Sequence, residues 1–155
     1  MATIIETLVM EHVVFCAVFD EIERVLPSLD SIREVGLLST VAERALRQHA
    51  ETETDLAYAA LDHVLAERGE LDHLYRDHRE IDYNFKQVHS ASSLAEAQLL
   101  LKKALAASRE HFRHEEQVVF PLLERVLPGE TLIELGETWS HAYRPLSLDE
   151  NRLSQ

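Results

Sequence analysis

Residues 100–118 read LLKKALAASREHFRHEEQV, and this stretch decides the fold. Its apolar residues recur every three or four positions, which predicts a helix with one apolar face. His111 and Glu115 lie four residues apart, about 40° around a helix, so both side chains fall on that apolar face. A carboxylate on a core face is costly unless something compensates its charge. The stretch therefore predicts a helix that carries a polar pair into the protein core.

The same pattern stands 62 residues earlier, where residues 38–56 read LSTVAERALRQHAETETDL. His49 and Glu53 take the places of His111 and Glu115. The apolar partners in this register are Leu38 with Leu100, Ala42 with Ala104, Ala45 with Ala107, and Leu56 with Val118. A single His-x-x-x-Glu is common on helices and carries little information. Its repetition in the same apolar register indicates two related helices.

Each of these helices follows a segment that carries one histidine on its apolar face, His12 in the first case and His78 in the second. The two segments align at an offset of 66, with the pairs Leu8–Leu74, His12–His78, Phe15–Ile81, Phe19–Phe85 and Ile22–Val88. A repeated helical hairpin can pack with pseudo-two-fold symmetry. The repeat therefore predicts two equivalent half-sites that meet in the middle of the molecule.

Helix-breaking residues divide the rest of the chain and predict an all-α fold. The first predicted helix runs from residue 3, with Thr3 as cap, to residue 26 before Pro27. The second follows Asp30 or Ser31 and runs to about Arg68 before Gly69, and the third follows Asp72 and runs to near Ser90. The fourth starts in Ser92-Ser93 and runs to near Leu127 before Pro128-Gly129, and a short fifth helix covers about 130–141. Pro121 should kink the fourth helix. Short connections between long helices favour an up-down-up-down four-helix bundle over residues 3–127, followed by a short fifth C-terminal helix and a tail over 130–155.

Composition supports a single domain over residues 1–155. Hydrophobic residues make up 46 % of the chain, with only 4 Gly and 4 Pro. A chain of 155 residues can bury a hydrophobic core without disulfides or structural metals. A net charge of −13 argues against binding to nucleic acid or to an anionic membrane. The single cysteine, Cys16, allows no disulfide within the chain. The N-terminus lacks the features of a signal peptide and no apolar run could span a bilayer, so we expect a cytoplasmic protein.

Four histidines and two glutamates thus share core faces, and together they predict a metal site. The predicted ligands are His12, His49, Glu53, His78, His111 and Glu115. Imidazole and carboxylate ligands suit iron, manganese or zinc, and no set of thiolates is present for a structural zinc. A lone core histidine is usually a hydrogen-bonded structural residue, but the repetition of the whole set favours the metal.

The pattern resembles the hemerythrin family, in its HHE cation-binding branch. The run from His111 to Pro121, HFRHEEQVVFP, is especially similar to the second motif of that family, and the resemblance covers about residues 3–127. It implies a left-handed four-helix bundle with two non-haem irons, bridged by carboxylates and with an oxo bridge as a further option. It also implies reaction with O2 or a related oxidant.

The pseudo-symmetry assigns His12 and His49 to one iron, and His78 and His111 to the other, with Glu53 and Glu115 as bridges, although partners could be exchanged. Oxygen-carrying hemerythrins have a fifth histidine at the place of Leu74, and they end in His-x-x-x-x-Asp. Here Glu115 stands at the fourth position after His111 and Glu116 at the fifth. Fewer imidazoles leave more open positions on iron, which favours turnover or sensing over reversible O2 carriage.

Several other side chains are candidates for a place near the metals. His73 could reach one only if its helix began with a distortion such as a π-bulge, and His141 only if the fifth helix folded back. Tyr58 and Tyr83 could each hydrogen-bond to the ligands or guard access to the site, although packing is the usual role. Cys16 follows His12 by one turn, as a small core residue or a redox-active neighbour. Glu23, His63, His89 and His114 are less favoured, because they are expected near the ends or the surface of the bundle.

Three functions are compatible with this pattern. The first is a di-iron protein that binds O2, peroxide or nitric oxide for sensing, detoxification or slow oxidase- or catalase-like turnover. The second is an iron-binding protein of iron homeostasis that has no turnover, in which metal binding changes stability. The third is a metal-free helical interaction module, which would have to bury six polar groups without compensation.

Overall fold

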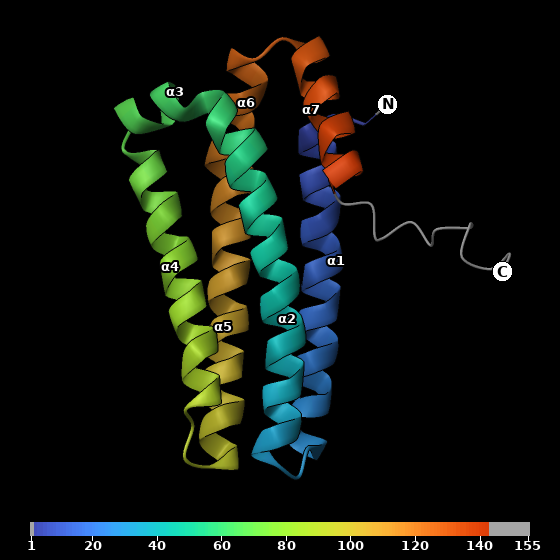
Figure 1. The fold of residues 1–155 in the computed structure, drawn as a ribbon, viewed down its shortest axis with the longest axis vertical. Helices are drawn as coiled ribbons and strands as arrows, with labels where there is room; N and C mark the ends of the chain where they lie inside the picture. The colour runs from blue at the N-terminus through green and yellow to red at the C-terminus, as the bar shows by residue number, and fades with distance from the viewer. Residues whose placement is uncertain (1, 143–155) are drawn as a thin grey trace, which may run out of the picture.

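The computed structural model describes residues 2–142, and its long helices run side by side along one axis (Figure 1). The helices are α1 (Ile4–Val25), α2 (Ile32–Glu53), α3 (Asp62–Glu67), α4 (Glu70–His89), α5 (Leu94–His114), α6 (Phe120–Val126) and α7 (Gly129–Ala142). Helices α1, α2, α4 and α5 alternate in direction, and residues 2–142 contain no strand. The predicted all-α bundle with a short fifth C-terminal helix is confirmed, while the predicted tail after that helix lies outside the described residues.

The starts of the long helices follow from capping side chains. The side chains of Thr3 and Ser31 each accept a hydrogen bond from the third backbone N–H of their helix. In return, the side chain of the glutamate at that third position accepts a hydrogen bond from the backbone N–H of the cap residue, which completes a capping box. Ser93 caps α5 in the same way but without the returning glutamate. Helix α4 begins two residues before the predicted start, directly after Gly69. That glycine has a φ of 72°, a left-handed conformation that a residue with a side chain rarely adopts.

The predicted continuity of the second and fourth helices was wrong. Helix α2 ends at Glu53, and the chain continues as a π-helical turn over Thr54–Tyr58 and a 3-10 turn over Ala59–Leu61. A second π-helical turn over Glu115–Val119 separates α5 from α6. The spacing of apolar residues cannot reveal such turns, because they change which backbone carbonyl each N–H bonds to and leave the residue types unchanged. Pro121 lies in the first turn of α6, where a missing backbone N–H is tolerated. The distortion expected in the fourth helix is the π-helical turn that precedes Pro121.

Two apolar clusters fill the bundle, one on each side of the predicted metal site. Leu8, Leu74 and Trp139 belong to one cluster, and Phe19 and Phe85 belong to the other. Because His12 lies between Leu8 and Phe19 along α1, and His78 between Leu74 and Phe85 along α4, the histidines occupy the level between the clusters. The polar level is therefore enclosed by apolar packing above and below.

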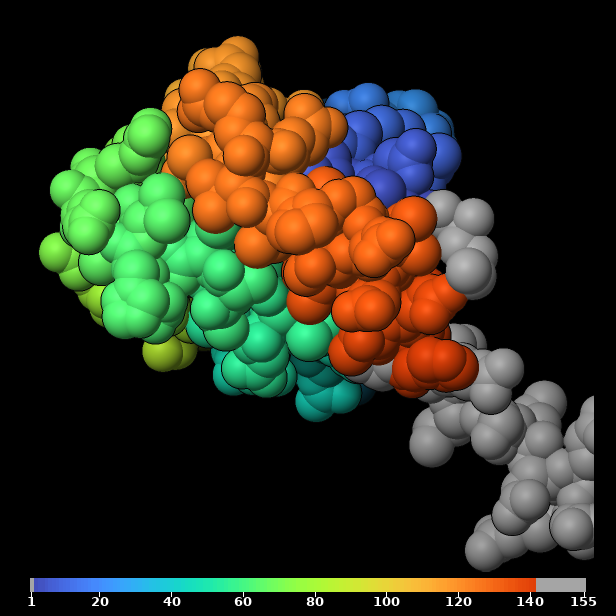
Figure 2. Space-filling view, turned by 90° about the horizontal axis from the view of Figure 1, so that it is seen from above, coloured from blue at the N-terminus to red at the C-terminus, as the bar shows by residue number. Residues whose placement is uncertain are grey.

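Helices α3, α6 and α7 cover one end of the bundle (Figure 2). Helix α7 packs along α1, and Gly136 makes the close approach possible. A side chain at Gly136 would collide with the backbone of Ala2, Thr3 and Ile4. This docking buries Trp139, which is 1 % exposed. Over the described residues, no helix combines the length and the apolar character needed to cross a membrane.

Candidate metal centre

The structure brings together all six residues that the sequence singled out as ligands. His12 comes from α1, His49 and Glu53 from α2, His78 from α4, His111 from α5 and Glu115 from the π-helical turn that follows it. Five of them are at most 3 % exposed, and His78 is half-buried. Their ligand atoms form two groups, each with all atoms within 4.8 Å of one another: Glu53, His78, His111 and Glu115 in the first, and His12, His49 and Glu53 in the second.

The two carboxylates lie between the groups. Glu53 belongs to both of them. Glu115 reaches both sides as well, because its Oε1 lies 3.3 Å from His111 Nε2 and its Oε2 lies 3.5 Å from His12 Nε2. The Nε2 atoms of His78 and His111 approach to 2.9 Å, so the two rings converge on one point. The two groups coincide with the half-sites that the pseudo-symmetry predicts; ligation itself stays a prediction.

The unpartnered polar atoms at this level fit a cation. Five buried side-chain atoms of the six residues have no hydrogen-bond partner in the described part of the chain: His12 Nε2, His49 Nε2, Glu53 Oε1, His111 Nδ1 and Glu115 Oε2. Buried polar groups in folded proteins are nearly always satisfied, and each unsatisfied one costs free energy. Nitrogen and oxygen donors in this ratio suit iron, manganese or zinc. Metal coordination would satisfy these atoms except His111 Nδ1, which lies 3.5 Å from Asp77 Oδ2.

Without metal, protons compensate the buried charge. Burial raises the pKa of Glu53 well above its usual value, and repulsion by Glu115 raises it further. Burial also opposes ionisation of Glu115, but the neighbouring His111 outweighs it and holds the pKa of Glu115 well below its usual range. Burial lowers the pKa of His111, yet Glu115 and Asp77 raise it overall to about 10. Burial lowers the pKa of His78 to about 4, so this imidazole is neutral and free to coordinate at pH 7.

Comparison with known families agrees with this geometry. The sequence model of the hemerythrin HHE cation binding domain matches residues 3–123. The chain belongs to this hemerythrin family. The matched region contains all six residues of the site, whereas α7 lies beyond it. Searches of curated proteins and of solved structures each found no match.

The hemerythrin-family site has an outer layer of carboxylates that the sequence analysis missed. Glu11 Oε2 lies 2.8 Å from His49 Nδ1, and Asp77 Oδ2 lies 3.5 Å from His111 Nδ1. Trp139 of α7 donates a hydrogen bond of 2.7 Å to Glu11 Oε1. Such partners fix the ring orientation and leave the opposite nitrogen facing the centre. The repeat held the signal, because each carboxylate directly precedes the histidine of its own helix and contacts the histidine of the next.

The two halves of the hemerythrin-family site differ at one outer position. Glu116 Oε1 lies 2.9 Å from His12 Nδ1, so His12 also has a carboxylate partner. The residue that corresponds to Glu116 in the first half of the repeat is Thr54, which has no carboxylate to offer His78. The half-site that contains His12 is therefore more completely supported than the half-site that contains His78.

Tyr58 lies at the centre of the site. Its hydroxyl donates to Glu115 in a short hydrogen bond and lies 3.3 Å from Glu53 Oε2. In an α-helix Tyr58 would face away from Glu53, but a π-helical turn places residues five apart on one face. Burial and the two carboxylates raise the pKa of Tyr58 well above its usual value. Of the roles weighed for Tyr58, hydrogen bonding to the predicted ligands is the one that the contacts support.

The other candidate histidines lie outside both groups. His73 is 38 % exposed and contacts Asp77, with Nε2 and Oδ2 3.2 Å apart, so it approaches the site only through that carboxylate. His141 is exposed at the end of α7. Leu74, at the place of the fifth histidine of the oxygen carriers, is fully buried. Cys16 is partly buried and burial raises its thiol pKa, which disfavours the reactive thiolate.

The unequal outer contacts lead to a prediction about metal affinity. Glu11→Gln and Asp77→Asn should each weaken metal binding, by roughly 10–100-fold, because loss of an outer carboxylate typically has that effect. We expect the larger loss for Glu11→Gln, since the Glu11 contact with His49 is shorter and is braced by Trp139. Calorimetric titration with Co²⁺ measures both. Glu67→Gln, an exposed position on α3, is the control, and equal affinity in all four proteins would contradict the prediction.

Proposed function

We propose that this hemerythrin-family protein holds two iron ions in a carboxylate-bridged site and uses them to bind or react with O2, peroxide or nitric oxide. The observation that carries the proposal is the sharing of Glu53 by two groups of convergent, buried ligand atoms. A single metal would leave one of these groups uncompensated. Two metals with common carboxylates would satisfy both.

In this proposal His78 and His111 hold one ion, and His12 and His49 hold the other. Glu53 and Glu115 lie between them. Two histidines with a carboxylate and open positions are typical of non-haem iron centres that use O2. Bound iron would supply ligand binding and electron transfer at these open positions. Leu74 adds no further imidazole, which favours sensing or turnover over carriage.

The protein's own side chains prepare this environment. Phe112 stacks on His12 with ring centroids 4.0 Å apart and packs edge-on against His49, so aromatic rings exclude water from one side of the site. The Tyr58 hydroxyl donates a hydrogen bond to Glu115. Glu11 accepts a hydrogen bond from His49 Nδ1, and Asp77 lies 3.5 Å from His111 Nδ1, so the opposite nitrogens of both rings are directed at the centre. The chain thus orients its ligands and limits access by water.

The test is the metal content per chain of protein purified without chelator, together with absorption spectra before and after addition of peroxide. We expect about two irons per chain and a near-ultraviolet charge-transfer band that peroxide changes. Two irons without any reaction toward peroxide, O2 or nitric oxide would favour the iron-homeostasis alternative. A folded protein that contains no iron and ignores added Fe²⁺ would overturn the proposal.

A further inference from the structure

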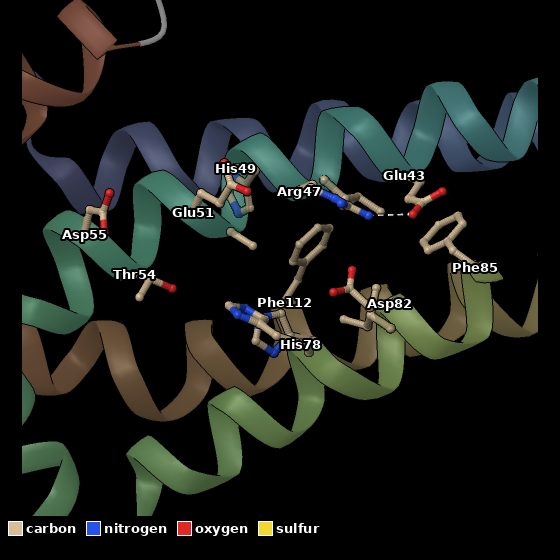
Figure 3. A pocket seen from close by; sticks show the side chains of 14 residues that line it. Glu43, Arg47, His49, Glu51, Thr54, Asp55, His78, Asp82, Phe85 and Phe112 are labelled. Carbon is tan, nitrogen blue, oxygen red and sulfur yellow. Dashed lines mark hydrogen bonds and ion pairs between the residues drawn. The ribbon is translucent and has the colours of Figure 1, made fainter.

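A cavity of about 450 Å³ leads into the site between α2, α4 and α5 (Figure 3). Three predicted ligands line its inner end: His49, His78 and His111. Thr54 lines it too, at the position where the other half of the repeat has Glu116. The cavity therefore opens on His78, the histidine without an outer carboxylate partner among residues 2–142, with His49 of the other half-site also on its wall.

One predicted ligand on the wall of this cavity has a buried atom without a hydrogen-bond partner. His49 Nε2 is unpartnered in the described part of the chain, and His49 is 2 % exposed. His12, by contrast, does not line the cavity; it stacks on Phe112 and Phe120 and contacts Glu116. A solute that enters from this side would meet both histidines of the half-site of His78 and His111, and only His49 of the other half-site.

Negative charge dominates the wall of this cavity. Glu51 is exposed on α2 and Asp55 is exposed on the π-helical turn that follows it, while Asp82 is half-buried on α4, across the opening (Figure 3). Among residues 2–142 these three carboxylates form no ion pair, whereas the single arginine of the wall, Arg47, is bound to Glu43 at 2.7 Å. A cleft lined by one sign of charge raises the local concentration of counter-ions.

We propose that this cavity is the route by which divalent cations reach the buried site, and that Glu51, Asp55 and Asp82 steer them into it. The inference rests on the proposed function, since it requires a metal site at the inner end. These three carboxylates are not ligands of the metal, and they affect only the rate at which it reaches the site. Anions would be repelled along the same path.

A second cavity offers a competing path and supplies a matched control. It measures about 290 Å³, reaches His111 from the α4–α5 face, and carries Glu80 and Glu110 on its wall. Its inner end is occupied by the contact between Asp77 and His111, and His73 stacks near His114 with ring centroids 4.3 Å apart. Neutralising two carboxylates at either opening changes the net charge of the protein by the same amount.

The experiment mixes metal-free full-length protein with Co²⁺ in a stopped-flow instrument and follows the visible absorbance of bound cobalt. We expect Asp55→Asn/Asp82→Asn to load roughly 10-fold more slowly at low ionic strength, in line with electrostatic steering. The difference should vanish near 1 M salt, where the Debye length is about 3 Å. Glu80→Gln/Glu110→Gln should load like the parent protein. Arg47→Gln should load faster, because it removes the arginine of the wall and frees Glu43.

Each outcome has a distinct meaning. The same final stoichiometry with a slower, salt-dependent rate supports the proposal. Equal rates for the parent and Asp55→Asn/Asp82→Asn at every salt concentration overturn it, and so does slow loading of only Glu80→Gln/Glu110→Gln. A lower final stoichiometry would make Asp55 or Asp82 a ligand, which also overturns it. If the parent protein bound no Co²⁺ at equilibrium, the proposed function would fail.

Discussion

Glu53→Gln is expected to empty both halves of the site at once. Because Glu53 belongs to both groups of ligand atoms, its loss removes a donor from each proposed ion. Changes in outer partners cost roughly 10–100-fold in affinity, so we expect a loss of about 100-fold or more for a shared direct ligand. Metal content after dialysis and calorimetric titration with Co²⁺ measure the effect.

The metal-free form of Glu53→Gln should lose no stability, although the variant loses its affinity for metal. Burial raises the pKa of Glu53 well above its usual value when no metal is bound, which favours the protonated carboxyl, and Gln has nearly the same shape as a protonated Glu. The free energy of unfolding of metal-free Glu53→Gln should therefore equal or exceed that of the metal-free parent. Urea titration of both proteins tests this, with Glu67→Gln as the surface control. A variant that retained two ions would show that Glu53 is not a shared ligand.

Removal of the metal should lower the melting temperature of the parent protein by about 10 °C. A ligand that binds only the folded state at about 1,000 times its Kd adds about 4 kcal/mol to the free energy of unfolding. For a chain of this size, each kcal/mol shifts the melting temperature by roughly 2–4 °C. The metal-free protein should remain helical, because the two apolar clusters do not depend on the ligands.

Circular dichroism melts with and without chelator measure this shift, and melts after re-addition of Fe²⁺, Mn²⁺ or Zn²⁺ rank the metals. Glu53→Gln should show almost no response to chelator or metal. Identical melting temperatures of chelated and metal-loaded parent protein would contradict binding at the buried site. A full response in Glu53→Gln would place the metal elsewhere.

The predicted ligand set follows from local helix geometry. Four residues advance a helix by slightly more than one turn, so His49 and Glu53, like His111 and Glu115, must share a face whatever their surroundings. The apolar residues at the same spacing show that this face points into the core. The repeat then supplies the pairing of two such helices, and capping residues such as Thr3 and Ser31 set where helices begin. These features depend on residues close in sequence.

The contacts that complete the site depend on how separate helices meet. The approach of Glu11 to His49, and of Asp77 to His111, is set by the rotation and axial shift of neighbouring helices, which the periodicity of one helix does not specify. Tyr58 reaches Glu53 only because the backbone changes to a π-helical turn. The sequence by itself determined the predicted ligands and the level they share. Only the tertiary structure decided the outer carboxylates, the central phenol and the open side of the site, because these result from packing between elements distant in the chain.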